Sequence, residues 1–442
     1  MSTISRIQGL EILDSRGHPT ALVRLELTNG IVATAAVPSG ASTGAFEAIE
    51  RRDNDPNRYN GKGVQEVIAS INTEIDQALK GKDILDQTNL DLILVTLDGT
   101  ENKSRLGANA LLGTSLAIAR AGAQFLNIPL FRYLSGCGPT IMPCPMFNIL
   151  NGGAHADNSI DFQEFMIRPH AASTFAESIR WAAEIYQSLR SLLKKQGFNV
   201  SVGDEGGFAP NLASDEQALQ LIVEAISTAG YKPGEEISIA MDCAASELYD
   251  QDEKRYIEKK HRSRKEPFKS RTTDEQITYL EELVQKYPID SIEDGLTDVD
   301  DWDGWHRLNV ALGEKIQIVG DDLFVTNPKF LERGIRERSA NAILIKLNQI
   351  GTLTETIETI QQARQAGWRT VVSHRSGETE DTFISDLAVA LRCGQIKTGA
   401  PCRSERTAKY NRLLYIEAFE ARNSQFLDTN TSAKICSSGK SS

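Results

Sequence analysis

Six short apolar runs in the second half of the chain end in side chains that can bind a metal or move a proton. In chain order, these side chains are Asp242, Glu293, Asp321, Lys346, the trio His374, Arg375 and Ser376, and Lys397. From Glu293 onward they follow one another at intervals of 23 to 28 residues, about the length of one strand-and-helix unit. In a (β/α)8 barrel the carboxyl ends of the strands surround one mouth, so this spacing predicts a single site.

The residue types in this set indicate a hard metal ion and a basic lysine. Asp242, Glu293 and Asp321 supply three carboxylates with no Cys or His among them, which suits Mg²⁺. Lys346 and Lys397 follow later strands, and a lysine beside a dication loses its proton more easily, so one can serve as general base. Zinc is disfavoured because the chain has no H-E-x-x-H motif and its six histidines are scattered.

Each of these positions also has a plainer interpretation. An acid or a lysine after a strand is commonly a solvated turn residue, although six such residues in register are hard to ascribe to coincidence. Glu205, within the Gly-rich segment GDEGGF, fits either a general acid or an ordinary charged turn residue. Gln163 and Glu164 precede a β-like run and can point into the same mouth. Residues 39–44 (SGASTG) have the composition of a flexible lid or of a linker.

The elements that must position these groups divide into two parts. Apolar and polar side chains alternate along residues 20–28, and residues 31–37 form a second β-like run. Asn29 and Gly30 lie between the two runs, which predicts a hairpin. Helical patterns follow at about 64–80 and 109–125, so the first third is α+β. After the Gly/Pro-rich stretch 135–145, β runs alternate with amphipathic helices, which implies a parallel sheet. No dinucleotide-binding or P-loop motif is present, so a barrel is favoured.

Composition limits the classes of function. The chain has 442 residues and a net charge of -12, which predicts two to three domains and argues against nucleic acid or anionic lipid as the main ligand. Six cysteines without C-x-x-C spacing do not make a disulfide scaffold, so we expect a reduced, cytoplasmic protein. The N-terminus has no secretory-signal pattern, and residues 106–126 are expected to form a buried helix rather than a membrane span.

Longer segments of the sequence resemble the enolase family over nearly the whole chain. They are PSGASTG, NGGAHADN, GDEGGFAPN, MDCAASE, SIEDGL, GDDLFVTN, IKLNQIGTLTET and SHRSGETEDTFISDLAVAL, with IEDGL and QEF closest to bacterial wording. The resemblance implies an α/β protein with an N-terminal α+β capping domain (1–135) and an enolase-type (β/α)8 barrel, ββαα(βα)6 (136–422). Residues 423–442 are expected to be a flexible polar tail.

The resemblance also implies an activity, that of a glycolytic hydro-lyase (phosphopyruvate hydratase) that reversibly dehydrates 2-phospho-D-glycerate to phosphoenolpyruvate. A lysine base with one or two Mg²⁺ is the known pattern of this superfamily. Lys346 would take the C2 proton and Glu205 would help the C3 hydroxyl to leave. Two Mg²⁺ are implied: a tight ion on Asp242, Glu293 and Asp321, and a second, substrate-assisted ion on Ser39. The implied substrate-binding residues are His155, Gln163, Glu164, His374, Arg375, Ser376 and Lys397.

Partners and location follow from the resemblance and from one charged segment. Family members are homodimers or octamers, and some bacterial members are reported at cell surfaces, secreted without a signal peptide, or beside RNA-degradation enzymes. Residues 254–271 carry nine Lys and Arg, which predicts a solvated loop, with a docking patch for an anionic partner such as RNA or for a host protein such as plasminogen as the alternative. Two further hypotheses are a relative that acts on another carboxylic acid and a surface-binding protein without catalysis.

Overall fold

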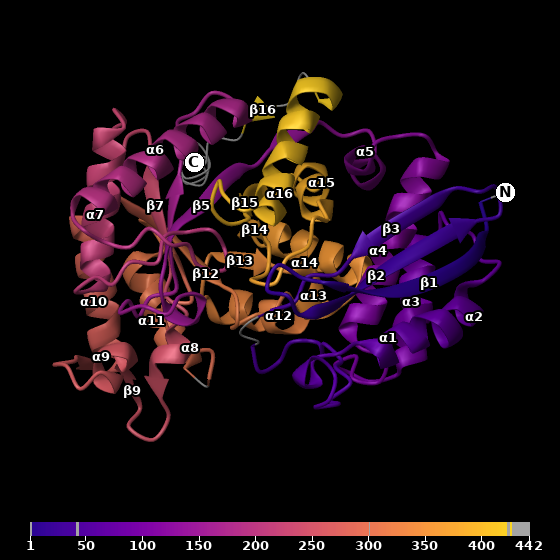
Figure 1. Ribbon diagram of the computed structural model, residues 1–442, viewed down its shortest axis with the longest axis horizontal. Coiled ribbons are helices and arrows are strands. Elements are labelled where there is room, and N and C mark those ends of the chain that lie inside the picture. Colours follow the sequence, from indigo (N-terminus) through magenta and orange to yellow (C-terminus); the bar gives the residue numbers. More distant parts are fainter. Residues whose placement is uncertain (1, 41–43, 300, 422–424, 427–442) are drawn as a thin grey trace, which may run out of the picture.

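The computed structural model describes residues 2–40, 44–299, 301–421 and 425–426. An N-terminal domain and a barrel domain lie side by side, with the last helices of the chain between them (Figure 1). This arrangement confirms the predicted α/β class, with an N-terminal α+β domain followed by a barrel.

The N-terminal sheet is an antiparallel meander of three strands. They are β1 (Ile4–Leu13), β2 (Pro19–Leu27) and β3 (Val32–Ala36), in that spatial order. The predicted hairpin at Asn29 and Gly30 is confirmed, since β2 pairs with β3 and Gly30 adopts a φ of 87° that a glycine tolerates. Val23, Leu25 and Leu27 of β2 are buried, so alternate positions of the strand face the core.

Helices pack on the buried face of this sheet and on one another. They are α1 (Gln65–Ser70), the π-helical η2 (Ile71–Ile75), α2 (Asp76–Leu79), α3 (Gln87–Asp98), α4 (Ala108–Phe125) and α5 (Leu130–Ser135). Helix α4 packs against β2 and β3, and nearly every residue along it is buried, as predicted for residues 106–126. Among the helices of the described residues, none has the length and apolar character needed to cross a membrane.

Eight strands close the barrel. In spatial order they are β5 (Cys144–Asn151), β6 (Glu164–Arg168), β7 (Ser238–Asp242), β11 (Ile289–Glu293), β12 (Gln317–Gly320), β13 (Ala342–Ile345), β14 (Arg369–Ser373) and β15 (Gly394–Lys397). Strand β6 runs antiparallel to both β5 and β7, whereas the other neighbouring strands are parallel. The irregular ββαα start implied by the resemblance is therefore confirmed.

The helices of the second domain surround these strands. They are α6 (Phe175–Lys195), α7 (Asp215–Thr228), α8 (Ala245–Leu248), α10 (Thr273–Lys286), α11 (Trp302–Leu312), α12 (Pro328–Glu337), α13 (Leu347–Ile350), α14 (Leu353–Gln365), α15 (Phe383–Ala390), α16 (Ser404–Tyr415) and the π-helical η4 (Ile416–Glu420). Because the helices surround the strands, side chains from many strand-and-helix units can meet at the ends of the strands (Figure 1).

The structure differs from the sequence prediction in one segment of the barrel domain. Residues 254–271 are not a loop: β8 (Tyr249–Asp250), β9 (Arg255–Ile257) and β10 (Ser270–Arg271) form a small antiparallel sheet, with α9 (Lys259–Ser263) between the last two strands. Tyr256 and Ile257 are buried, and their burial outweighs the surrounding charge.

Ion pairs and hydrogen bonds join the two domains. Arg120 on α4 pairs with Asp381 of the barrel domain at 2.6 Å, and Lys103 pairs with Glu355 on α14 at 2.6 Å.

At the other end of the chain, β16 (Gln425–Phe426) pairs with β4 (Ile141–Met142), within the segment predicted to be a flexible tail. Residues 423–424 and 427–442 of that predicted tail lie outside the described residues.

Candidate active site

The carboxyl ends of the barrel strands converge on one mouth, as the spacing of the sequence predicted. Asp242 ends β7, Glu293 ends β11 and Lys397 ends β15, while Asp321 and Lys346 lie one residue beyond β12 and β13. A single cavity there is lined by His155, Gln163, Glu164, Glu205, Asp242, Lys346, Ser373, His374, Arg375, Ser376 and Lys397. Glu293 pairs with Lys397 and Asp321 pairs with Lys346, so both acids contact a lysine that lines the cavity.

Lys397 occupies the centre of an acidic cluster. Its Nζ lies 2.8 Å from Glu293 Oε1, 3.1 Å from Asp242 Oδ2 and 3.2 Å from Glu164 Oε2. Burial alone would lower the pKa of this lysine, but Asp242, Glu164 and Glu293 raise it well above the ordinary value. Lys397 is therefore a fixed positive charge on the floor of the cavity.

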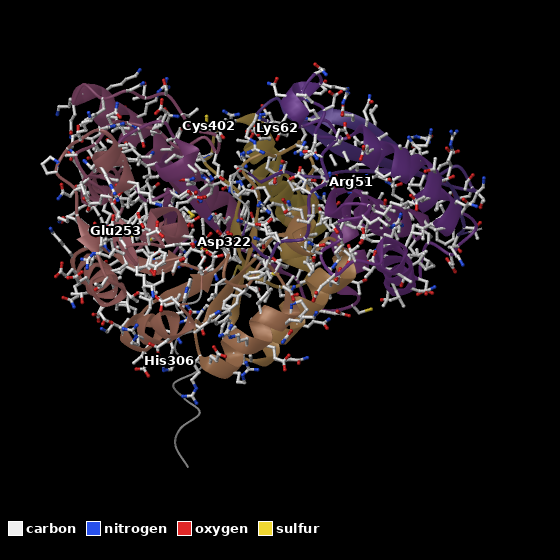
Figure 2. The ribbon with its side chains drawn as sticks, turned by 90° about the horizontal axis from the view of Figure 1, so that it is seen from below. Arg51, Lys62, Glu253, His306, Asp322 and Cys402 are labelled. Atoms are coloured by element: carbon white, nitrogen blue, oxygen red, sulfur yellow. The ribbon has the colours of Figure 1, made fainter. Side chains whose placement is uncertain are left out.

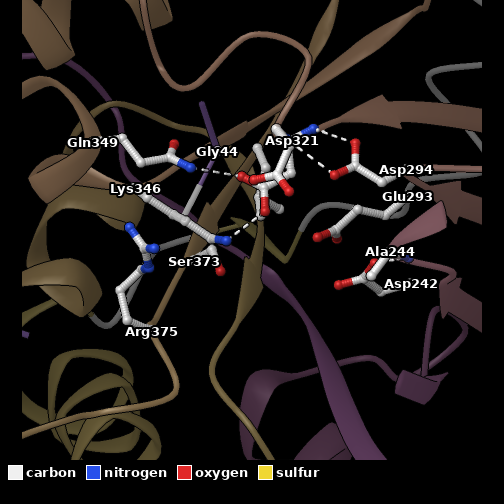
Figure 3. A network of polar contacts seen from close by, with 12 residues as sticks. Gly44, Asp242, Ala244, Glu293, Asp294, Asp321, Lys346, Gln349, Ser373 and Arg375 are labelled. Atoms are coloured by element: carbon white, nitrogen blue, oxygen red, sulfur yellow. Dashed lines mark hydrogen bonds and ion pairs between the residues drawn. The ribbon is translucent and has the colours of Figure 1, made fainter. Parts of the chain in front are cut away.

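Lys346 forms an ion pair with Asp321 (Figure 3). Asp321 also accepts a hydrogen bond from Gln349 Nε2 at 2.9 Å, from the first turn after β13. Burial alone would lower the pKa of Lys346, but the Asp321 carboxylate raises it above the ordinary value. In this state Lys346 is an ammonium, and any ligand that draws charge away from Asp321 makes its proton easier to lose.

Glu205 also lines the cavity. Its Oε2 accepts a hydrogen bond from Asn148 Nδ2 at 2.9 Å and lies 3.3 Å from His374 Nε2, and its Oε1 lies 3.6 Å from His155 Nδ1. Burial alone would raise the pKa of Glu205, but charge interactions with the nearby imidazoles of His374 and His155 lower it well below the usual range. The carboxyl that sequence alone left as an acid or a turn residue thus lies inside the mouth.

The protonation of His374 follows from its two neighbours. Burial and the nearby Arg406 guanidinium lower the pKa of His374 to about 3, so the imidazole is neutral. Arg406 donates to His374 Nδ1 at 2.6 Å, which leaves the proton on Nε2, 3.3 Å from Glu205 Oε2. Arg406 also donates to the carbonyl oxygens of Arg375 and Ser376, each at 2.6 Å, and so holds the whole 374–376 segment.

The acidic residues of the mouth outnumber their nearest cations. The pKa of Glu164 is raised well above its usual value by burial and by Glu205, and that of Glu293 by burial and by Asp242. Within the described part of the chain, the second carboxylate oxygen of Glu293 is buried without a hydrogen-bond partner. Buried oxygen donors with surplus negative charge fit a hard divalent cation.

Two groups of acids and histidine have ligand atoms within 4.8 Å of one another and could hold a metal: His155 with Glu164 and Glu205, and Asp294 with Asp321 and Asp322. The predicted trio does not form one such tight group: Asp321 pairs with Lys346, whereas Asp242 and Glu293 pair with Lys397. Figure 3 shows Asp321 beside Lys346, with Asp242 and Glu293 farther away. Carboxylate clusters that could bind a metal are therefore present. Asp321 belongs both to the predicted trio and to the group with Asp294 and Asp322.

Ser39 lies at the edge of the mouth and is not among the residues that line the cavity. Its backbone pairs with Gly377, next to Ser376, through hydrogen bonds of 2.7 and 2.8 Å. Its hydroxyl accepts from Arg52 at 2.9 Å and from Arg16 at 3.1 Å, and lies 3.2 Å from Glu50 Oε2. The structure thus places this predicted ligand beside residues 374–376, which the sequence predicts to bind substrate, and the Arg16 and Arg52 side chains donate to its hydroxyl.

Sequence reasoning missed several residues that hold the site. They are Asn148, Asp294, Gln349, Arg406 and Glu47, the last of which pairs with Arg375. Asp294 has a left-handed φ of 43°, and its carboxylate accepts from the backbone N–H groups of Asp321 and Asp322 at 2.9 and 3.0 Å. The Asp-Gly pair after Glu293 is a turn signal that could have marked this position.

A closed barrel whose mouth gathers two lysines, several carboxylates and a buried arginine has the features of an enzyme active site. Two family models match the chain: the enolase N-terminal domain over residues 4–134 and the enolase C-terminal TIM barrel domain over residues 139–435. The chain belongs to the enolase family, and its activity is of the hydratase or dehydratase type.

Proposed function

We propose that this chain is a glycolytic enolase, a phosphopyruvate hydratase that reversibly converts 2-phospho-D-glycerate into phosphoenolpyruvate and water. The observation that carries the proposal is that Lys346, Glu205, Arg375 and Lys397 all line the same cavity. A base, a proton donor and two fixed cations in one buried space match a substrate that bears a carboxylate, a phosphate and a leaving hydroxyl.

Asp242, Glu293 and Asp321 are the residues that would hold a tight Mg²⁺, and Ser39 would contribute to a second, substrate-assisted Mg²⁺. The bare oxygen of Glu293 and the surplus acid charge around it support this assignment. When bound, Mg²⁺ neutralises the substrate carboxylate and so makes the neighbouring C2 proton acidic enough to remove. The chain's own residues then have to place the substrate and move two protons.

Lys346, once it has lost its own proton and is a neutral amine, takes the proton from C2, and the electron pair of that C–H bond forms the C2–C3 double bond. The C3–O bond breaks, and Glu205 delivers a proton to the departing hydroxyl, which leaves as water. Glu205 has a low pKa in the substrate-free chain, and the arrival of an anionic substrate beside it raises that pKa toward the proton-carrying form. Neutral His374 and Asn148 hold its carboxyl toward the cavity.

The remaining lining residues bind the substrate. Arg375 and Ser376, with His155, are proposed to hold the phosphate, because an arginine fork matches phosphate oxygens. Lys397 neutralises the carboxylate end, with Gln163, Glu164 and His374 as further substrate contacts. Gln163 Nε2 donates to Asp242 Oδ2 at 3.3 Å, which ties this substrate contact to a proposed metal ligand.

The test is turnover of 2-phosphoglycerate, measured as the rise in phosphoenolpyruvate absorbance with excess Mg²⁺. We expect turnover in the wild type, its loss in EDTA, and a fall of at least about 10³-fold in Lys346→Ala, the range expected for a general base. Lys194→Ala, which removes an exposed lysine of α6, should keep the wild-type rate. An inactive wild type or an unchanged rate in Lys346→Ala would sink the proposal.

A relative that removes a proton from a carboxylic acid without a phosphate is the second chemistry to exclude. Arg375 argues against it, because its guanidinium lines the cavity and an arginine fork matches phosphate oxygens. A panel of phosphorylated and unphosphorylated 2-hydroxy acids decides the matter. Preference for an unphosphorylated acid would replace the proposed substrate.

Oligomeric state and further partners stay predictions: a homodimer or octamer, a cytoplasmic location, and an additional binding role with RNA-degradation enzymes or plasminogen. The segment 254–271, predicted as the docking patch, has several of its cations paired. Arg255 pairs with Glu275, Arg262 with Glu253 and Arg271 with Glu258. Glu253 lies on the side of the barrel domain away from the N-terminal domain (Figure 2). This pairing lowers the charge available to an anionic partner.

A further inference from the structure

Glu47 is a buried carboxylate of the N-terminal domain that reaches the barrel mouth. It follows β3 on the segment that crosses between the domains, and its residue exposure is 8%. Arg375, whose exposure is 4%, comes from the barrel segment after β14. The pair therefore joins two parts of the chain that are 328 residues apart in sequence.

The Glu47 carboxylate holds the guanidinium of Arg375 by two of its nitrogens. Arg375 NH1 lies 2.9 Å from Glu47 Oε2, and NH2 donates to Glu47 Oε1 at 3.1 Å. Asn348 Oδ1 accepts from the same NH1 at 3.1 Å. A two-point contact with a planar fork fixes both the position and the rotation of the guanidinium.

Glu47 is itself fixed by groups outside this pair. Its Oε1 accepts from the backbone N–H of Gly44 at 3.1 Å and from Gln349 Nε2 at 3.2 Å. Gln349 Nε2 also donates to Asp321, and its Oε1 accepts from the Thr326 hydroxyl at 2.7 Å. The Glu47 carboxylate is thus held from the N-terminal domain and from the barrel, and it cannot turn without breaking several hydrogen bonds.

Glu47 does not contact the cavity directly. Among the described residues, the cavity lining includes Arg375, Ser376 and Lys346 but not Glu47. Its influence on a ligand must pass through Arg375. An arginine that has to meet a phosphate in one orientation loses less conformational freedom on binding when a partner has already ordered its side chain.

We propose that Glu47 is a positioning residue for phosphate recognition, which orients Arg375 toward the phosphate-bearing end of the substrate from the N-terminal domain. The inference rests on the proposed function, because it takes Arg375 as the phosphate contact. It adds that the N-terminal domain sets the geometry of this contact, so affinity for the phosphate depends on a residue outside the barrel.

The test compares Glu47→Gln with the wild type in two measurements. Glutamine keeps the size of the side chain but offers one acceptor oxygen and turns an N–H₂ group toward a guanidinium that also only donates. Because Arg375 contacts the phosphate equally in the ground and transition states, KM for 2-phosphoglycerate should rise at least about tenfold with kcat within about threefold. The dissociation constant of inorganic phosphate, measured by calorimetry, should rise by a similar factor.

Glu355→Gln is the matched control. Glu355 also pairs with a cation of the other domain, Lys103, but does not touch Arg375. It should leave KM and phosphate affinity at the wild-type values. Glu47→Asp keeps the charge but shortens the reach, so its KM should lie between those of the wild type and Glu47→Gln, and it serves if the glutamine variant does not fold.

A double-mutant cycle separates positioning from general stability. In an Arg375→Lys background the fork is absent, so Glu47→Gln should change KM and phosphate affinity by less than twofold. Turnover by the wild type with unchanged KM and phosphate affinity in Glu47→Gln overturns the inference, as does an equal effect in both backgrounds. A wild type that does not turn over 2-phosphoglycerate overturns the proposed function instead, and phosphate binding by the variants still tests the link from Glu47 to Arg375.

Discussion

At the scale of single residues, buried carboxylates in this protein differ in what neutralises them. Glu293 and Asp242 share Lys397, and Asp321 has Lys346, so these acids are matched by lysines. Asp215, at the start of α7, is compensated differently. Its Oδ1 accepts from the backbone N–H groups of Asp161 and Phe162, each at 3.1 Å, and so holds the end of the loop that follows His155.

Asp215 should make the stability of the fold depend on pH. Burial and the neighbouring Asp161 raise the pKa of Asp215 to about 7, whereas an unfolded aspartate titrates near about 3.9. Because its pKa is raised on folding, Asp215 stays protonated to a higher pH in the folded state than in the unfolded state. The free energy of unfolding therefore falls as pH rises from about 4 to about 7. Asp215→Asn keeps an acceptor oxygen without this titration.

We expect the variant to gain about 2 kcal/mol on the wild type between pH 5.5 and pH 8, from the part of the titration that lies in this window. Urea unfolding of both proteins at the two pH values measures the difference. A gap that stays the same at both pH values would contradict the role given to Asp215.

At the scale of elements, the contact between α4 and β2 depends on one small residue. A Cβ placed on Gly113 of α4 would lie 2.7 Å from Val23 Cγ2 and 3.1 Å from Val37 Cγ2. The helix can approach the sheet this closely because position 113 has no side chain. Since α4 is buried along its length, the spacing of helix and sheet here affects the core of the whole N-terminal domain.

Gly113→Ala tests this packing. Alanine favours a helix by about 1 kcal/mol over glycine, but overpacking a tight core costs about 1–3 kcal/mol, so we expect a net loss of about 1 kcal/mol. In a Val23→Ala background the space is open, and the same substitution should stabilise the protein. Chemical unfolding of the four proteins measures both effects, and additive changes would mean that the two residues do not compete for space.

At the scale of the whole molecule, the two domains are joined by buried polar contacts. Asp381 of the barrel domain pairs with both terminal nitrogens of Arg120 on α4, at 2.6 and 2.7 Å. It also accepts from the backbone N–H of Ala36 on β3 at 3.0 Å. One carboxylate therefore links the barrel domain to a helix and a strand of the other domain, so we expect the domains to unfold together.

Asp381→Asn tests the coupling. Removing one partner of a buried ion pair leaves the other charge uncompensated, which should cost about 3 kcal/mol. The four tryptophans are all in the barrel domain: Trp181, Trp302, Trp305 and Trp368. Tryptophan fluorescence therefore follows the barrel, and far-UV circular dichroism follows both domains.

Both signals should move to lower denaturant by the same amount, with coincident midpoints. If circular dichroism instead showed an earlier partial transition in the wild type, the domains would unfold separately, and the proposed coupling would be wrong.

Local patterns were enough to predict much of this protein. The hairpin at Gly30, the buried helix α4 and the strands that end in Asp242, Glu293 and Lys397 all depend on neighbouring residues. Hydrophobic periodicity and turn chemistry are properties of short segments, so the sequence shows them directly. Regular spacing then placed the strand ends at one mouth, because parallel strands of a barrel point the same way.

Tertiary structure alone decided how the groups of the mouth are paired. Sequence reasoning named Arg375 and Glu205, but not Glu47 or Asn148, which hold them across 328 and 57 positions of the chain. It also missed the sheet formed by residues 249–271, because the burial of Tyr256 outweighs a local excess of charge.

The sequence by itself determined which chemical groups stand at the strand ends. Only the folded chain decided which of them are charged, since a carboxylate or lysine takes its pKa from neighbours brought close by packing. Lys346 beside Asp321 and neutral His374 beside Arg406 are set by such long-range contacts.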